Sequence, residues 1–454
     1  MRALLRLLIV GAAFAVLHRV AAAAPVAARA ALALGGLVLV AWTTADALAR
    51  WRVPRVTTFV IAGFVVGPAW LGLVRGDELA SLRLIERLAL APLALRAGAA
   101  FRLPDHPAGD DPTGWGRFVV GTIVVPFLLI TLVTLSVASG FPLTAHQPIG
   151  DALATALALA ALATAAGPTL AIATLDEIPP GRFGAQLLRA NVVRDWIAVA
   201  LFGVCLLVAR PLASPGAVRL TAAGAMAMTL AASLLGGVAL GFFVARYRRV
   251  LGGEPALYLG AMFLLAAVAA QAGPADITLT MLAAGWWLAQ FAAEDWAWLR
   301  QPLEGGTAFF VAVAFGLAGA AFDLDVLGDI WPWILLLAGI RAVGLYWGGR
   351  WAARQPLVTP ALAGVGWLGL ISQGGVALLL AGVARRAFPE WGVSFEALAV
   401  ALVAVHAVAG PLCLRLAVSR GVSTLQGASV DRLTESVGAA NGAIPGPGGS
   451  GVRQ

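Results

Sequence analysis

Long apolar segments separated by short polar loops recur along most of the chain. Each segment holds about 20 mostly hydrophobic residues, which is the length that a helix needs to cross the hydrocarbon core of a bilayer. None of them alternates polar and apolar residues as a strand of a membrane barrel does. The pattern therefore predicts an all-α polytopic membrane protein with about 13–14 transmembrane helices. The expected ranges are 3–20, 27–48, 55–74, 80–101, 116–138, 150–174, 184–209, 217–245, 255–272, 276–293, 306–321, 329–349, 361–384 and 395–418.

The composition agrees with this fold class, because 60% of the 454 residues are hydrophobic and only 12% are charged. No loop is long enough to form a soluble domain. We therefore expect one transmembrane domain over residues 1–418. The chain turns polar from about Gly421, and residues 419–454 are predicted to form a disordered cytoplasmic tail, because they cannot bury enough apolar surface to fold alone.

The first 24 residues allow two interpretations. Arg2 and Arg6, followed by an apolar run and four alanines, have the order of a secretory signal. The same residues are long enough for a first transmembrane helix, which is the interpretation that we favour.

The charged residues indicate an orientation in the membrane. The net charge is +8, and the positively charged side chains, all arginines, are scattered among short loops and form no patch that would bind nucleic acid. Arginines are more frequent in the loops after even-numbered helices, while the loop that carries Asp323, Asp325 and Asp329 has none. By the positive-inside rule, both termini face the cytoplasm, and we expect a multi-pass protein of the inner (plasma) membrane.

Two of the apolar segments contain a helix-breaking run. In the first, Pro168 cannot donate a main-chain hydrogen bond, and Gly167 makes departure from helical geometry easy. In the second, the run is Ser372, Gln373 and Gly374. Paired interruptions are typical of inverted-repeat transporters, in which two broken helices cross near the bilayer midplane and their free main-chain groups face the transported ion. The alternative interpretation is a pair of ordinary kinked helices.

Asp195 is the most informative polar residue, because it lies in the apolar segment 184–209. An acid in such a segment costs about 2.5–3.5 kcal/mol on insertion scales, and such residues usually face the bundle interior and have a function. A secluded carboxylate can hold either a proton or a monovalent metal cation such as Na⁺ or K⁺, because hard cations prefer oxygen ligands. Asn191 lies one helical turn earlier, and the hydroxyl groups of Thr164 and Thr169 are candidate ligands beside the first interruption.

Three further ionisable residues lie in or beside apolar segments. We expect Arg341 to be the counter-charge of Asp195, because a lone charge in its apolar surroundings would be costly. Arg194 is a second counter-charge candidate, but on a helix it would project about 100° away from Asp195 and can reach cytoplasmic water instead. His406 is a candidate titratable group, although a lone histidine on an apolar helix is more often a packing residue. Asp195 and Arg341 can also be interpreted as a fixed salt bridge that only holds the bundle together.

Several segments, taken together, resemble the cation/proton antiporter superfamily, and in particular its sodium/proton exchanger-like branch. The resemblance implies that Asp195 is the ion-binding aspartate, that Arg341 is a buried basic residue near it, and that the chain forms a homodimer. It also implies an ion-binding core over residues 116–209 and 306–418. Arg194 departs from the family pattern, which has Asn or Asp at that position. The similar motifs are residues 52–56 with 61–68, 167–177, 191–202, 315–327 with Arg341, and 367–377.

The sequence therefore predicts a secondary active transporter that exchanges Na⁺ or K⁺ for H⁺ by alternating access at Asp195, with a role in pH homeostasis. Two alternatives stay open. One is a non-transporting membrane sensor or subunit with an antiporter-like fold, which the departure at Arg194 favours; the other is a sodium-coupled organic-anion symporter. An enzyme is not expected, since the sequence has no metal-ligand cluster, nucleophile motif or phosphate loop. The expected partners are the cation, the proton and the lipid bilayer, without a cofactor.

Overall fold

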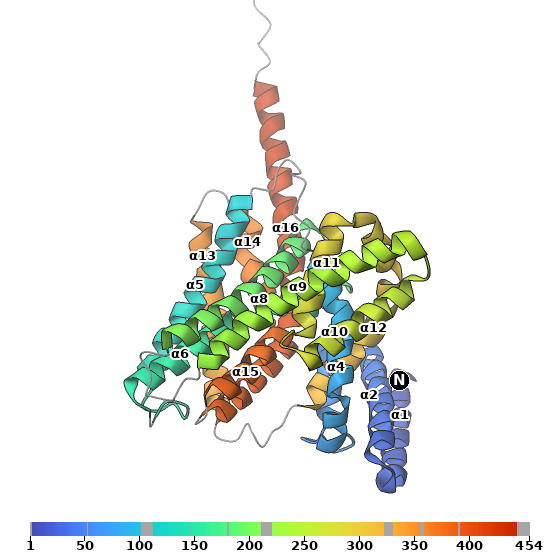
Figure 1. Cartoon of the computed structure of the whole chain (residues 1–454). Coiled ribbons are helices and arrows are strands. Elements are labelled where there is room, and N and C mark those ends of the chain that lie inside the picture. Colours follow the sequence, from blue (N-terminus) through green and yellow to red (C-terminus); the bar gives the residue numbers. More distant parts are fainter. Residues whose placement is uncertain are drawn as a thin grey trace, which may run out of the picture.

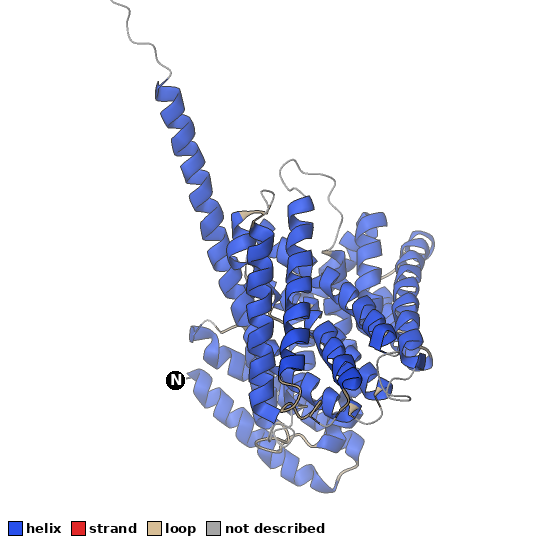
Figure 2. Cartoon of the chain, turned by 90° about the vertical axis from the view of Figure 1, so that its left-hand side faces the viewer, coloured by secondary structure: helices blue, strands red, loops and turns tan. Residues whose placement is uncertain are grey.

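The structure is a computed structural model of the chain, and every regular element of the part that it describes is a helix (Figure 1; Figure 2). The loop with Asp323, Asp325 and Asp329 lies outside the described residues. The described ranges are 2–51, 53–100, 112–145, 147–178, 181–209, 220–321, 330–354, 358–388 and 391–442.

The helices follow one another in the order predicted from hydropathy, and each predicted apolar segment forms a helix or a broken pair of helices. The all-α prediction is therefore confirmed. The helices are α1 (Arg2–Val20), α2 (Val26–Leu48), α3 (Arg55–Val66), α4 (Gly76–Ala99), α5 (Pro112–Ser136), α6 (Ile149–Thr164), α7 (Pro168–Leu175), α8 (Arg182–Ala209), α9 (Leu220–Leu251), α10 (Pro255–Ala272), α11 (Ile277–Phe291), α12 (Ala293–Ala320), α13 (Trp331–Ala353), α14 (Pro360–Val365), the 3₁₀ helix η4 (Gly366–Leu370), α15 (Gly375–Ala387) and α16 (Gly392–Gly442).

The lengths and hydropathies of these helices define a multi-pass membrane protein. Within the described ranges, nine helical spans are long and apolar enough to cross a membrane, and a bent pair formed by α14, η4 and α15 makes a tenth. The predicted total of about 13–14 also counts shorter apolar helices, such as α3 and α11, and the more polar α4.

Two helix boundaries differ from the predictions by more than ten residues. α12 begins at Ala293 and not near residue 306, because Glu294 and Asp295 hide the start of a helix from the hydropathy pattern without preventing it. α16 continues to Gly442, so the part of the predicted tail before that residue is helical, and it projects beyond the bundle in both views (Figure 1; Figure 2). Only the first turn of a helix carries the unfavourable cost of nucleation, so an existing helix can be extended through polar residues.

Glycines allow several helix pairs to approach closely. A Cβ atom on any of these glycines would overlap with the main chain of the partner helix. Helices inside a bilayer are not driven together by the hydrophobic effect. Small residues let them approach closely, so that van der Waals contacts stabilise the pair. The positions are Gly63 and Gly319 between α3 and α12, Gly98 and Gly285 between α4 and α11, and Gly121 and Gly348 between α5 and α13.

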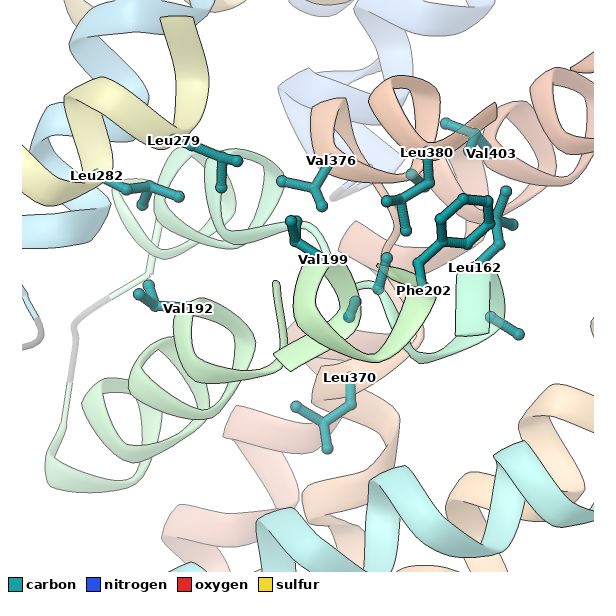
Figure 3. Packing of buried hydrophobic residues seen from close by; sticks show 14 of the residues in the cluster. Leu162, Val192, Val199, Phe202, Leu279, Leu282, Leu370, Val376, Leu380 and Val403 are labelled. Atoms are coloured by element: carbon teal, nitrogen blue, oxygen red, sulfur yellow. The ribbon is translucent and has the colours of Figure 1, made fainter. Parts of the chain in front are cut away.

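Apolar side chains from several helices surround α8. Figure 3 shows Phe202 of α8 gathered with Leu162 of α6, Leu380 of α15 and Val403 of α16. Phe202 is completely buried. Because its neighbours come from both broken segments, this packing fixes the rotation of α8, and with it the direction in which Asp195 points.

Candidate functional site

The helical main chain is interrupted at both places that the sequence predicts. α6 ends at Thr164, and the chain resumes as α7 at Pro168. The second helix is interrupted between Leu370 and Gly375, and its two halves are bent by 52° relative to each other. The predicted pair of broken helices is therefore confirmed.

The two interruptions touch each other, which makes the broken helices cross. The N–H of Gly374 donates a hydrogen bond to the C=O of Ala166 (3.1 Å). A Cβ atom on Gly167 would lie 3.2 Å from the main-chain carbonyl carbon of Gln373, closer than an ordinary contact. The absence of a side chain at Gly167 thus allows this approach of two main chains.

Asp195 lies on α8 and faces this crossing. It is only 1% exposed, and its Oδ1 accepts a hydrogen bond from the N–H of Ala166 (2.8 Å). Ala166 lies between α6 and α7, so its N–H is available to a side chain. Ala166 therefore has two partners. Its N–H binds Asp195, and its C=O binds Gly374 of the second broken helix.

Arg341 of α13 binds the main-chain oxygen atoms of both interruptions. Its guanidinium group is buried, and it donates four hydrogen bonds to carbonyl groups near the ends of α6 and η4. A positive charge is favourable at such helix ends, where unpaired carbonyl groups carry negative partial charge. The bonds run from Nε to the oxygen of Ala163 (2.8 Å), from Nη1 to that of Ile371 (2.6 Å), and from Nη2 to those of Ala165 (3.0 Å) and Leu370 (3.1 Å).

Arg341 makes no direct ion pair with Asp195, the carboxylate whose counter-charge it was predicted to be. No nitrogen atom of Arg341 lies within 4.0 Å of a carboxylate oxygen of Asp195. Its charge is compensated by carbonyl dipoles, which the two interruptions leave without helical partners. Arg341 therefore holds the crossing together, and its charge acts on Asp195 only over a longer distance.

Arg194 is also buried, contrary to the expectation that it reaches water. It is 0% exposed, and its guanidinium donates to the carbonyl oxygen atoms of Thr122 (2.8 Å) on α5 and Thr164 (3.0 Å) at the end of α6. The side chain points away from Asp195 as the helical geometry predicts, but the space there is filled by neighbouring helices. Arg194 thus joins α5, α6 and α8.

Asn191 and the two threonines lie close to the interruptions but use their polar groups differently. The Nδ2 of Asn191 donates to the oxygen atoms of Leu187 (2.8 Å) and Gly369 (3.0 Å), while its buried Oδ1 has no partner. The hydroxyl of Thr164 donates within its own helix, to Ala161 (2.7 Å). Thr169 is 1% exposed and lies near Gly374.

The second interruption contributes further buried oxygen atoms. The Nε2 of Gln373 donates to the carbonyl of Leu162 (3.1 Å), and its Oε1 has no partner. The Oγ of Ser372 is also buried without a partner. His406 of α16 is 3% exposed and lines a small cavity together with Gln373 and Arg341. The structure thus places His406 beside Arg341, at the crossing.

A wider cavity opens near the end of α7. Its walls include Arg96, which binds both carboxylate oxygen atoms of Asp176 (2.6 and 2.5 Å). Glu177 accepts a hydrogen bond from the N–H of Arg55 (2.8 Å). Burial raises the pKa of Glu177 above its ordinary value of 4.5, and the bond from Arg55 opposes this rise. Sequence reasoning missed this cavity, because Arg96 and Asp176 are far apart in the chain.

Two broken helices that cross beside a buried carboxylate define the scaffold of a secondary transporter. The family model described as sodium/hydrogen exchanger, transmembrane, matches residues 35–415, and the chain belongs to this family. A comparison with curated proteins finds no match.

Solved structures support the same fold. One of them is the sodium proton antiporter MjNhaP1 from Methanocaldococcus jannaschii, which aligns with a TM-score of 0.58 over 85% of this chain and 98% of that chain. The two sequences are only 14% identical, so the likeness concerns the fold.

Proposed function

We propose that this sodium/hydrogen exchanger family member exchanges one monovalent cation for one proton at Asp195. The observation that carries the proposal is the position of this carboxylate, which is buried at the crossing and bound to the N–H of Ala166. One oxygen atom of the carboxylate is held by the main chain. The other is free to bind a proton or a cation, but not both.

Oxygen atoms for a cation are available close to the interruptions. The Oδ1 of Asn191, the Oγ of Ser372 and the Oε1 of Gln373 are buried and lack hydrogen-bond partners. A buried polar atom without a partner is costly, and a bound cation would remove that cost. These side chains are therefore candidate ligands in addition to the carboxylate of Asp195, in one or the other state of the transport cycle.

The charges at the crossing favour exchange in a one-to-one ratio. Arg194 and Arg341 bring two positive charges, and both guanidinium groups are bound to carbonyl groups. We therefore assign the change of charge during exchange to Asp195. A proton and a monovalent cation each neutralise this carboxylate, so the loaded site has the same net charge with either ion.

The proposal is tested by measuring proton movement in inverted vesicles with a pH-sensitive dye after addition of Na⁺, K⁺ or Li⁺. The variant Asp195→Asn keeps an oxygen atom that accepts from Ala166, so the fold is retained while the charge is lost. We expect exchange in the wild type and none in Asp195→Asn. A matched control is Asp46→Asn, because Asp46 also lies in a membrane helix but is exposed.

Each other result has a definite meaning. Equal proton movement in the wild type and Asp195→Asn would exclude Asp195 from the mechanism. A wild type that moves no protons with any cation would favour the sensor or subunit. Sodium uptake that requires an organic anion would indicate a symporter.

A further inference from the structure

The surface between α5 and α13 carries a groove that is separate from the crossing. The two helices lie side by side, joined by the close contact of Gly121 with Gly348 (Figure 1). Trp347 and Trp351, at the side of this groove, are 56% and 47% exposed. The groove is lined by Val125, Trp347, Arg350, Trp351, Ala353 and Arg354.

The groove runs along α5 from Val125, at the middle of the membrane span, toward the end of the span at Gly114. The membrane span of α5 runs from Gly114 to Ser136, and Gly121, which touches Gly348, lies near the Gly114 end. Arg350 and Arg354 follow Gly348 on α13 and therefore lie toward the same end. Exposed tryptophans at this depth are typical of the boundary between the acyl chains and the headgroups.

Arg350 and Arg354 place positive charge at the headgroup end of the groove. Both are exposed, and among the described residues no carboxylate lies within 4.0 Å of either guanidinium. The guanidinium of Arg350 lies 5.9 Å from the ring centre of Tyr346. Guanidinium groups bind phosphate with paired hydrogen bonds, and basic pockets between membrane helices suit anionic lipid headgroups.

We propose that this groove binds an anionic phospholipid. Arg350 and Arg354 bind the headgroup phosphate, while one acyl chain lies along Val125 and the indole rings of Trp347 and Trp351. The lipid would then hold the end of α13, the helix that also carries Arg341. The inference does not depend on which ions the protein exchanges.

The test is a titration of the purified full chain in a neutral detergent with phosphatidylglycerol, followed by native mass spectrometry. Each arginine near an anionic headgroup lowers the dissociation constant about fivefold, so removal of both should weaken lipid binding about thirty-fold. We expect this loss in the double variant Arg350→Gln and Arg354→Gln, and a smaller loss in Arg354→Gln alone. Phosphatidylcholine should bind the wild type more weakly than phosphatidylglycerol does.

A control variant separates this groove from general surface charge. Arg246 is an exposed arginine near the end of the membrane helix α9, beside exposed Tyr247, and Arg246→Gln should leave binding unchanged. Equal binding by the wild type and the double variant would overturn the proposal. So would an equal loss in Arg246→Gln, or displacement of the lipid by the same concentration of inorganic phosphate. Retained helical content in the variants, measured by circular dichroism, establishes that a loss of binding does not come from unfolding.

Discussion

Arg341 is the side chain on which the geometry of the crossing most depends. It donates to four carbonyl groups that belong to both broken helices, and it does so from a third helix. The planar guanidinium group presents several donors in a fixed arrangement, which a lysine ammonium cannot reproduce. The identity of this residue as arginine, and not only its charge, therefore maintains the crossing.

We predict that Arg341→Lys destabilises the protein by about 3 kcal/mol, because it leaves at least one or two buried carbonyl groups without donors. The midpoint of thermal unfolding in detergent measures this effect. Arg385→Lys is the control, since the Arg385 side chain is 57% exposed and its single ion pair with Glu396 contributes little. An Arg341→Lys variant as stable as the wild type would show that the four hydrogen bonds are dispensable.

The buried carboxyl group of Glu177 should make the stability of the protein depend on pH. Burial raises its pKa in the folded state above 4.5, so the folded protein holds this proton more tightly than the unfolded chain does. Stability should therefore fall as the pH rises from 4.5 through the folded-state pKa. Glu177→Gln removes the ionisable group, and with it this pH dependence of stability, but keeps an oxygen atom that accepts from the N–H of Arg55.

The measurement is the difference in unfolding midpoint between Glu177→Gln and the wild type as a function of pH. We expect the variant to gain stability relative to the wild type above pH 4.5, and the difference to disappear below this value. A difference of the opposite sign at neutral pH would mean that ionised Glu177 is stabilised by its neighbours.

The broken helices and the close helix pairs are the elements that shape the site. The contact of α5 with α13 has a second consequence, because Thr122, next to Gly121, accepts a hydrogen bond from Arg194. The spacing of α5 and α13 thus also sets the position of a carbonyl group that binds the helix of Asp195.

We predict that Gly348→Ala forces α5 and α13 apart and costs about 1–3 kcal/mol, because the new methyl group meets the main chain at Gly121 and Thr122. Gly339→Ala on the same helix is the control, since a Cβ atom there has no neighbour within 4 Å. It should leave stability unchanged or raise it by about 0.5–1 kcal/mol. Thermal unfolding of both variants compares them directly, and equal midpoints would contradict the close contact.

Helices and their interruptions were predictable from the sequence where residues close together in the chain determine them. Long apolar runs located the helices, and Gly167 with Pro168 located an interruption, because their effect on the main chain is local. The start of α12 was missed, since polar residues in its first turns break the apolar pattern.

The contacts at the site depend on the assembled fold. Asp195, Arg194 and Arg341 were singled out by one local property, a charge in or beside an apolar segment. Their hydrogen-bond partners were not predictable, because the carbonyl groups that they meet come from helices far apart in the sequence. The same holds for the four carbonyl groups that bind Arg341, which stays the predicted counter-charge of Asp195 but makes no direct ion pair with it.

At the scale of the whole molecule, the proposed exchange by alternating access requires that the crossing open to one side of the membrane at a time. The large cavity lies at the α7 end of the first broken helix, and Ile149 marks the other end of the same span. The arginine distribution predicts that the α7 end is cytoplasmic.

We predict that a cysteine in place of Ala308, which lines the large cavity, reacts with a membrane-impermeant maleimide in inverted vesicles but not in right-side-out cells. A cysteine in place of Ile149, which is 81% exposed, should show the reverse pattern. Both changes are made after Cys205 and Cys413 are replaced by alanine. Reversed labelling of both positions would invert the predicted orientation.

The peptide units around Ala166 connect the carboxylate of Asp195 to the second broken helix without using any side chain. Asp195 and Gly374 are thus linked through one residue of backbone, and among the side-chain replacements at Ala166 only proline, which has no N–H, would remove the hydrogen bond to Asp195. An ester in place of the amide that ends in the Ala166 nitrogen would remove the hydrogen bond to Asp195 and keep the C=O that binds Gly374, so it would separate the two contacts.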